Sequence, residues 1–191
     1  EPYGTESSSP KARPGAEPPG IRADSRKLTA PCGTPRVLED DMEQILPVFG
    51  LNGDLPPGIY RVAMQVVASE LGSTNPRRIQ LQSRLERIYG VAWATNRLRR
   101  FIVYSSFVTA KSEPNDIDVF MVMGDAFDSA KLTGEARILF DHGAAQAHFG
   151  ASVSWVRSAG ALGGEDETIA YWQTTRDGGQ RGIIEIVGES I

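Results

Sequence analysis

The chain has 191 residues, of which 40% are hydrophobic and 23% are charged, so it can bury one sizeable core. Its formal net charge of −4 argues against a broad nucleic-acid surface, and we find no strong DNA-binding signal. A single cysteine, Cys32, argues against a disulfide framework and a cysteine-based metal site. No apolar run reaches membrane-spanning length and no signal-peptide pattern opens the chain, so we expect a cytoplasmic protein without a membrane partner.

The first 38 residues differ in composition from the rest, because they are rich in proline, glycine, serine and charge and have few aromatic residues. Such a segment buries too little apolar surface to offset the entropy lost on ordering it. We therefore predict a disordered tail over residues 1–38 and a folded domain over residues 48–191. A role of the proline-rich pieces as a peptide ligand for a partner is the less favoured interpretation.

Two helices are predicted at the start of the folded domain. Two prolines and a glycine introduce the first at about Ile59, and Gly72 is its expected C-cap. The second begins at Pro76 and takes its N-cap from Asn75 or Thr74. Its predicted apolar face comprises Ile79, Leu81, Leu85, Ile88 and Val91.

Arginines gather in and just after this second helix and form the one basic concentration of the chain. They are Arg77, Arg78, Arg84, Arg87, Arg97, Arg99 and Arg100. We interpret them mainly as a solvated helix face. The alternative is a contact to an acidic partner, to RNA, or to nucleotide phosphates near the following strand.

The most informative stretch reads FIVYSSFVTAKSEPNDIDVFMVM. Residues 101–104 and 119–123 are apolar runs that are typical of buried strands. Ser105 and Ser106 follow the first run in a turn of small residues, and a polar loop then leads to the second run. This stretch therefore predicts a strand, a turn, a loop and a second strand.

Two aspartates stand at the start of the second of these strands. Because side chains alternate between the faces of a strand, Asp116 and Asp118 project to one side while Ile117 points into the core. Two adjacent carboxylates repel each other, and a divalent cation relieves that repulsion. Their hard oxygen ligands suit Mg²⁺ that is bound together with substrate phosphates.

The remainder of the chain is predicted to hold one more helix and three strands. The helix covers residues 135–149 and carries His142 and His148, whose spacing places them on different faces and fits no metal site. Residues 151–157 alternate as a strand. Residues 169–175 and 181–187 flank Asp177-Gly178-Gly179, a strong hairpin signal.

Four side chains near this hairpin have two interpretations. Tyr171 and Trp172 are expected in the core or on the sheet surface, with base stacking as the less favoured role. Arg176 and Arg181 could approach a triphosphate, which is also the less favoured role for them. The glycine-rich, acidic loop over residues 159–166 lacks the spacing and lysine of a phosphate-binding loop.

The segment SFVTAKSEPNDIDV and its flanking strands resemble the signature of the nucleotidyltransferase superfamily. This superfamily includes DNA polymerase beta, kanamycin-type nucleotidyltransferases and the minimal nucleotidyltransferase antitoxins. Its signature is a hydrophobic strand, Gly-Ser, a loop, and Asp-hydrophobic-Asp leading into another strand. More narrowly, residues 49–187 resemble an uncharacterised bacterial family of nucleotidyltransferase-like domains, through LPPGI, SFVTAKSEPNDIDV and YWQTTRDGGQRGIIEI.

The resemblance implies an α/β domain with a small mixed β-sheet and helices packed on it. It implies Mg²⁺-dependent transfer of a nucleoside monophosphate from an NTP to a hydroxyl on a protein, an RNA or a small molecule. Asp116 and Asp118 would be the catalytic metal ligands. Ser105 and Ser106 would form the phosphate-binding turn, and Lys111 is the most credible cation for phosphate charge.

The chain departs from the superfamily pattern in two ways. Ser105 occupies the glycine position, where its Cβ narrows the space for phosphate and resists a positive φ. A third carboxylate is missing from the strand over residues 151–157, and Glu185 is the nearest substitute by residue type. The chief alternative is therefore a catalytically degenerate nucleotidyltransferase fold that acts as a binding module, such as the antitoxin of a toxin–antitoxin pair.

Overall fold

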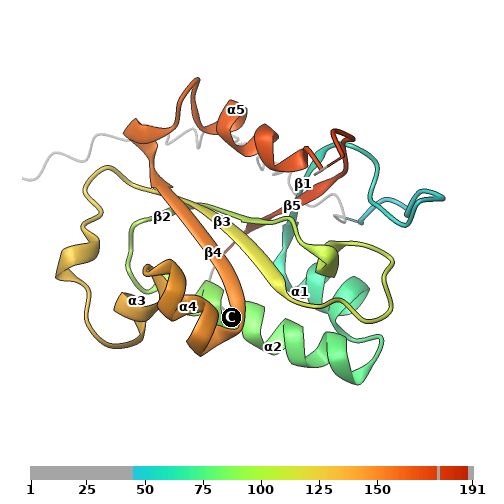
Figure 1. The fold of residues 1–191 in the computed structure, drawn as a ribbon, viewed down its shortest axis with the longest axis horizontal. Coiled ribbons are helices and arrows are strands. Elements are labelled where there is room, and N and C mark those ends of the chain that lie inside the picture. Colours follow the sequence, from blue (N-terminus) through green and yellow to red (C-terminus); the bar gives the residue numbers. More distant parts are fainter. Residues whose placement is uncertain (1–44, 176, 189–191) are drawn as a thin grey trace, which may run out of the picture. The chain divides into compact units, whose positions relative to one another are not determined.

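The structure is a computed structural model that describes residues 45–175 and 177–188. The predicted disordered tail, residues 1–38, lies outside the described residues. The described part forms a five-stranded mixed β-sheet with helices on both faces (Figure 1). This architecture confirms the predicted α/β class with a small mixed sheet.

The sheet combines two parallel pairs of strands. Its order is β1 (Ile59–Ala63), β5 (Ile183–Val187), β2 (Leu98–Val103), β3 (Ile117–Met123) and β4 (Ala151–Arg157). The β1–β5 and β3–β4 pairs are parallel, and β2 is antiparallel to both of its neighbours. As a result, β2 ends at the edge of the sheet where β3 and β4 begin.

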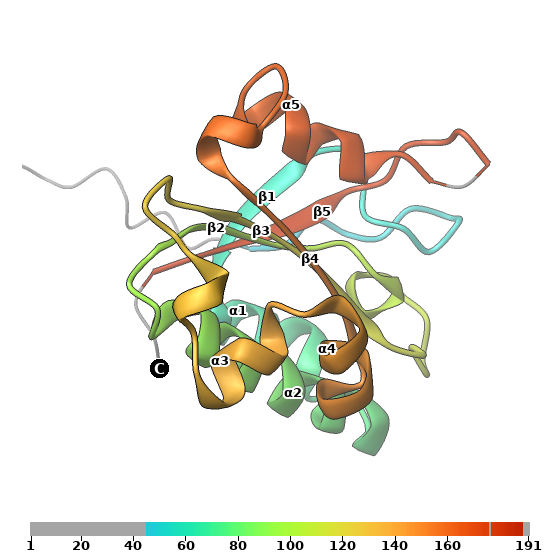
Figure 2. The same cartoon turned by 60° about the vertical axis from the view of Figure 1, so that its left-hand side comes forward.

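The helices divide unequally between the two faces of the sheet. One face carries α1 (Met64–Val67), α2 (Pro76–Trp93), α3 (Gly134–Leu139) and α4 (His142–Phe149). The other face carries α5 (Glu165–Ala170), which continues into a 3₁₀ turn, Tyr171–Gln173 (Figure 2). We call these the α2 face and the α5 face.

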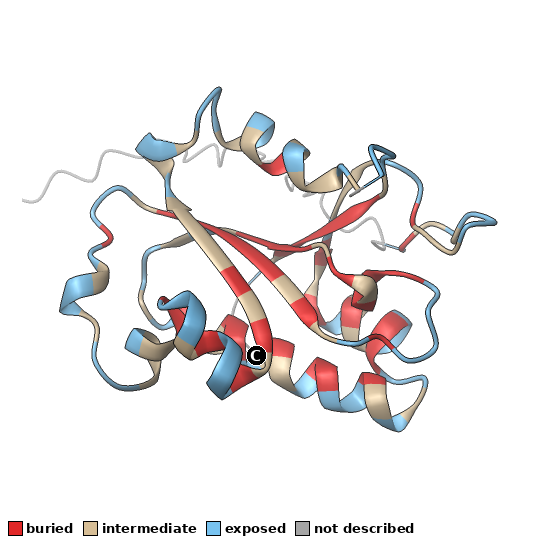
Figure 3. Cartoon of the chain, viewed as in Figure 1, coloured by how far each residue is buried: buried red, intermediate tan, exposed pale blue. Residues whose placement is uncertain are grey.

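The core is likewise unequal, with a large cluster under the α2 face and a small cluster under α5. Buried positions concentrate along the strands and on the sheet-facing sides of the helices (Figure 3). The small cluster contains Ile102, Phe120, Val122, Ile169 and Ile183. Alternation along β3 sends Ile117 and Val119 to the large cluster and Phe120 to the small one.

The predicted helix starting at Ile59 is wrong, because residues 59–63 form strand β1. This segment pairs in parallel with β5, so that Ile59 lies opposite Ile183. Val62 is buried in the large core, and the chain turns helical only at Met64. A partner so distant in the sequence overrides the local helical spacing that suggested a longer helix.

The predicted strand over residues 169–175 is also wrong, because it is replaced by α5 and the 3₁₀ turn that follows it. Three acidic residues in the first turn of α5 favour a helix through the helix dipole. The predicted turn at Asp177 is present, but the described residues on its two sides form an isolated bridge between Thr174 and Gln180 in place of a pair of strands. The partners of β5 are β1 and β2 instead.

The third predicted helix, over residues 135–149, is interrupted. The chain leaves α3 at Phe140, and Asp141 caps α4 by accepting a hydrogen bond from the Ala144 N–H at 2.8 Å. The prediction for α2 is confirmed, since it begins at Pro76 and is capped by the side chain of Asn75. Ile79 on α2 is 52% exposed, however, so it does not belong to the apolar face.

Candidate functional site

A cavity of about 870 Å³ lies at the edge of the sheet where β2 ends and β3 and β4 begin. Three segments that are distant in the sequence line it. One runs from Tyr104 to Asp118, the second is the start of β4 with Ser152, and the third covers Tyr171 to Arg181. The described residues of these segments place mainly oxygen-bearing side chains around the cavity.

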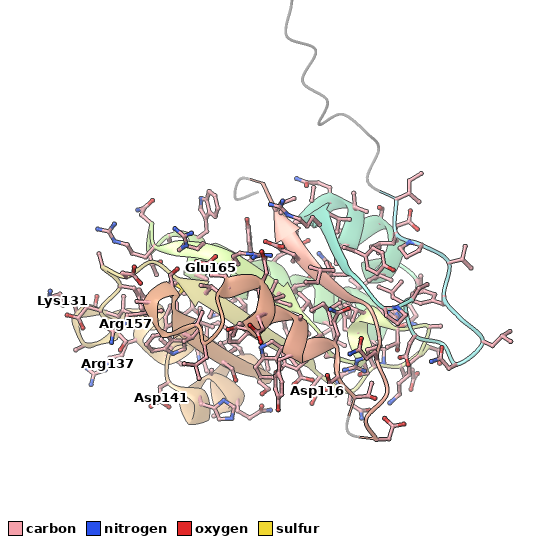
Figure 4. The ribbon with its side chains drawn as sticks, turned by 90° about the horizontal axis from the view of Figure 1, so that it is seen from above. Asp116, Lys131, Arg137, Asp141, Arg157 and Glu165 are labelled. Carbon is pink, nitrogen blue, oxygen red and sulfur yellow. The ribbon has the colours of Figure 1, made fainter. Side chains whose placement is uncertain are left out.

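Both predicted metal-ligating aspartates line this cavity. Asp116 immediately precedes β3 and Asp118 lies within it, while the intervening Ile117 is fully buried in the large core. The two carboxylates therefore project to the α5 side of the sheet, as alternation predicts. In Figure 4, which looks onto the α5 face, the labelled Asp116 lies away from Lys131 and Arg157.

The strand next to the aspartates contributes a hydroxyl group. Ser152 is the register partner of Asp118 in the parallel β3–β4 pair, and its side chain lines the cavity. On the other side of β3, the Tyr104 N–H donates to the Asp118 carbonyl at 3.2 Å. Asp118 thus lies between the end of β2 and the start of β4.

The two predicted phosphate-binding serines have different surroundings. Ser106 lines the cavity, and its Oγ accepts a hydrogen bond from the Asn115 N–H at 3.3 Å, which closes the loop. Ser105 is buried, and its Oγ accepts from the Phe107 N–H at 3.1 Å. The φ of Ser105 is −81°, so this backbone does not need glycine at the position. Only Ser106 of the pair reaches the cavity.

Lys111 does not line the cavity. Its Nζ donates to Asn115 Oδ1 at 3.2 Å, so its side chain supports a lining residue from the outside. The two histidines of α4 do not line the cavity either. His142 contacts the carbonyl of Val153 at 3.0 Å, and His148 contacts Glu135 at 3.1 Å.

Arg78 holds the loop that carries the site. Its guanidinium is buried and donates to four backbone carbonyls, those of Leu71, Phe107, Thr109 and Lys111, at 2.6–3.1 Å. Burial lowers the pKa of Arg78 below its ordinary value. The interpretation of the arginine cluster as a solvated helix face is therefore wrong for Arg78.

Two neighbours of Arg78 hold the rest of the same loop. Arg77 donates to the carbonyls of Pro114, at 3.0 Å, and Asn115. The side chain of Asn75 donates to the Ser112 carbonyl at 2.7 Å. Sequence reasoning missed these positioning roles. A signal was available, because cations in the first turn of a helix oppose the helix dipole and need another partner.

Arg181 is the cation that lines the cavity among the described residues. It is fixed at the wall, because its Nη2 donates to the Tyr104 carbonyl and its backbone N–H donates to the Gln173 carbonyl at 2.9 Å. Its Nε is buried and has no hydrogen-bond partner. Arg176, the other arginine singled out in the sequence, lies outside the described residues.

The pKa of Tyr104 reflects its burial and the charges that line the cavity. Burial raises the pKa of its phenol well above the ordinary value, and the nearby charge of Asp118 raises it further. Arg181 opposes this effect, and Asp116 adds to it. The phenol therefore stays neutral between the two carboxylates and the guanidinium.

Aromatic side chains complete the wall on the α5 side. The Trp172 ring packs against Tyr104, with ring centroids 4.4 Å apart, and against Phe120 at 5.0 Å. Tyr171 lies edge-on to Trp172 and is 71% exposed. Trp172 thus belongs to the small core, as predicted for a sheet-surface aromatic, whereas Tyr171 presents its ring to solvent and to the cavity.

Glu185 does not line the cavity. It is buried on β5 and pairs with Arg100 through two hydrogen bonds of 2.7 Å and with Arg61 at 3.5 Å. The strand β4, where the superfamily pattern expects a third acid, presents Ser152 instead. The described lining of the cavity therefore contains two carboxylates, those of Asp116 and Asp118.

The donor atoms fit a hard divalent cation. Within the described part of the chain, no group of three or more His, Cys, Asp or Glu side chains could hold a metal ion by itself. Asp116 and Asp118 supply carboxylates, and Ser106, Asn115 and Ser152 supply further oxygens at the same cavity. Such a set suits Mg²⁺, which uses one or two carboxylates and completes its shell with water and substrate phosphates.

Comparison with known proteins assigns the family. Residues 47–187 match the sequence profile of a family of unknown function, DUF6932. The chain belongs to this family. No curated protein and no solved structure matches the chain. The DUF6932 range includes all five strands and every described residue that lines the cavity.

The helices were also compared with the dimensions of a bilayer. Among residues 45–175 and 177–188, none of the helices has both the length and the apolar character that spanning a membrane requires.

Proposed function

We propose that this DUF6932 domain binds a Mg²⁺–NTP complex and transfers a nucleoside monophosphate to a hydroxyl acceptor. One observation carries the proposal: Ser106, Asp116 and Asp118, the residues of the nucleotidyltransferase-like signature, line a single cavity. Its volume of about 870 Å³ is within the range of small-molecule and cofactor sites. The acceptor belongs to a protein, an RNA or a small molecule.

Each of these residues has a separate part in the proposed reaction. Asp116 and Asp118 hold the metal ion, which supplies charge neutralisation and orientation of the phosphates when bound. Ser106 presents its hydroxyl to a phosphate oxygen from the turn after β2. The acceptor hydroxyl attacks the α-phosphorus, so that a new O–P bond forms while the bond from the α-phosphorus to the α,β-bridging oxygen breaks. Pyrophosphate leaves with that oxygen, and the proton of the acceptor hydroxyl passes to solvent.

The contacts from α2 to the loop have a positioning role in the proposed site. Arg77, Arg78 and Asn75 hold the backbone between Ser106 and Asp116, so the hydroxyl and the carboxylates keep a fixed separation. Pre-organisation of this kind is what nucleotidyl transfer requires, because most of its catalysis is positioning and charge stabilisation.

Calorimetric titration tests the proposal. The protein is titrated with ATP, GTP, CTP and UTP, with and without Mg²⁺, alongside an Asp116→Asn/Asp118→Asn double variant. We expect Mg²⁺-dependent binding of at least one NTP, weakened about tenfold or more in the double variant. The matched control is Asp141→Asn, because asparagine also caps α4. Absence of binding to all four NTPs would contradict the proposal.

A second candidate, a non-catalytic binding module, is favoured by the missing acid. The register partner of Asp118 on β4 is Ser152, so no carboxylate stands ready there to accept the proton of an acceptor hydroxyl. The binding module could act as the antitoxin of a toxin–antitoxin pair. An NTP labelled at its α-phosphate separates the candidates. Transfer of the label to protein or RNA supports the enzyme, whereas nucleotide binding without transfer supports the binding module.

A further inference from the structure

We propose that residues 171–175 together with Arg181 form the nucleotide-recognition wall of this cavity. In this assignment, Arg181 binds phosphate oxygens and Tyr171 stacks on the base. The inference rests on the proposed function and deepens it, because it assigns the two ends of the nucleotide to named side chains. The signature around Ser106 and Asp116 includes neither residue.

The charges around the cavity support a phosphate contact at Arg181. Among the described lining residues, two carboxylates are opposed by the single guanidinium of Arg181. Without a metal ion this balance is negative and repels a polyphosphate. With a divalent cation on Asp116 and Asp118 the balance becomes positive, so the metal and Arg181 together attract the polyphosphate.

Arg181 is also built to stay in place. Its Nη2 is anchored on the Tyr104 carbonyl, and its own backbone is tied to Gln173. One anchored nitrogen leaves further guanidinium donors for a ligand, since arginine carries five N–H groups in a planar fork. Lys111, the cation suggested by the sequence, lacks this placement, because it does not line the cavity and its ammonium donates to Asn115, which does.

Tyr171 and Trp172 divide the aromatic wall between a fixed ring and an open ring. Trp172 is occupied by its packing on Tyr104 and Phe120. Tyr171 touches Trp172 edge-on, with ring centroids 5.7 Å apart, and is 71% exposed. Its faces are therefore open to a planar ligand. A base stacks on such a ring without regard to sequence, because every base has a π-face.

Hydroxyl groups next to the open ring add polar contacts. Thr174 and Thr175 line the same wall between Tyr171 and Arg181. Thr175 also shapes the following turn, because its N–H donates to the Gly179 carbonyl at 2.9 Å. The hydroxyl of Thr175 donates to Asp177 Oδ1 at 2.5 Å, so Thr174 is the threonine whose hydroxyl is proposed to contact a nucleotide that extends along the wall.

The experiment compares two probes, Mg²⁺–ATP and Mg²⁺–tripolyphosphate, on the full chain by calorimetry. Tripolyphosphate has the charge of the phosphate chain and no base. We expect Arg181→Gln to lower the affinity for both probes about tenfold or more, since it removes charge-assisted hydrogen bonds. We expect Tyr171→Leu to lower the affinity for ATP about fivefold or more and to leave the affinity for tripolyphosphate unchanged.

Conservative variants and matched controls keep the test readable. Tyr171→Phe retains the ring and should bind ATP as the wild type does. Arg181→Lys retains the charge but not the planar fork of donors. It is the variant to compare with the wild type if Arg181→Gln does not fold. Arg157→Gln removes an exposed arginine from the far end of β4, and Leu162→Ala removes an exposed apolar side chain (Figure 4 labels Arg157). Neither control should change the affinity for either probe.

The outcomes separate this inference from the proposed function. If the wild type binds both probes through Asp116 and Asp118 while Arg181→Gln binds tripolyphosphate normally, the phosphate assignment is overturned and the proposed function stands. If Tyr171→Leu weakens both probes equally or neither, the base assignment is overturned. If the wild type binds neither probe and none of the other three NTPs, the proposed function and this inference fail together.

Discussion

The loop between Ser106 and Asp116, called the signature loop from here on, depends on the side chain of Arg78 for its geometry. Arg78 is buried and satisfies carbonyls of residues 71, 107, 109 and 111. Replacing it with methionine keeps much of the volume and leaves these carbonyls without a donor. We expect Arg78→Met to lower the free energy of unfolding by about 3 kcal/mol. Urea denaturation measures this loss, and Arg84→Met on the same helix is the control. A loss no larger than that of the control would contradict the role of Arg78.

Tyr104 gives the cavity a pH signature. A tyrosine of the unfolded chain ionises near pH 10, whereas burial and Asp118 raise the pKa of Tyr104 in the folded protein. Above about pH 10 the unfolded state therefore binds fewer protons, and the stability that Tyr104 contributes below this pH is lost as the pH rises towards the folded pKa. We expect Tyr104→Phe to lose less stability than the wild type between about pH 8 and pH 11.

Urea midpoints of the two proteins at a series of pH values measure this difference. The pKa of Tyr89 is also raised by burial, but Tyr89 is present in both proteins and cancels in the comparison. Parallel curves for Tyr104→Phe and the wild type would show that folding does not raise the pKa of Tyr104.

At the scale of the element, the N-cap residue of α2, Asn75, both caps the helix and holds the signature loop. Asn75 accepts from the Arg78 N–H at 3.0 Å and donates to the Ser112 carbonyl at 2.7 Å. We expect Asn75→Ala to cost about 1–2 kcal/mol, because it removes both contacts. Asn75→Asp keeps the cap and loses the contact to Ser112, so its cost should be smaller. Thermal and urea unfolding compare the variants, and a stability of Asn75→Asp equal to that of the wild type would mean that the loop contact adds nothing.

The elements that the sequence predicted well are those with strong local signals. Strand β3 has an apolar run with a clear start, and α2 has a proline at its first position after an asparagine cap. Strand β2 contains most of the apolar run predicted over residues 101–104, but it begins earlier, at Leu98, and ends at Val103. Strand β1 and helix α5 were missed, because their state depends on distant partners. Strand β1 exists through its pairing with β5, and Ile169 of α5 packs against the small core.

At the scale of the molecule, the same contrast applies to the candidate site. The placement of Ser106, Asp116 and Asp118 in one cavity follows from strand alternation and a short loop, so the sequence could predict it. The contributions of Ser152 and Arg181 depend on which strands neighbour β3 and β2 in the sheet. Lys111 was predicted by its closeness in sequence, and it lies outside the cavity lining, where its ammonium donates to Asn115 Oδ1.

Paramagnetic broadening by Mn²⁺ tests the central claim most directly, since Mn²⁺ prefers the same oxygen ligands as Mg²⁺. A trace of Mn²⁺ with ATP is added to ¹⁵N-labelled protein, and the amide signals are followed. We predict selective loss of the signals of Ser106, Asp116, Asp118 and Ser152, and recovery in the Asp116→Asn/Asp118→Asn variant. The signals of Arg157, at the far end of β4, should persist. Broadening centred elsewhere in the chain, or broadening that survives in the double variant, would contradict a metal–nucleotide site in this cavity.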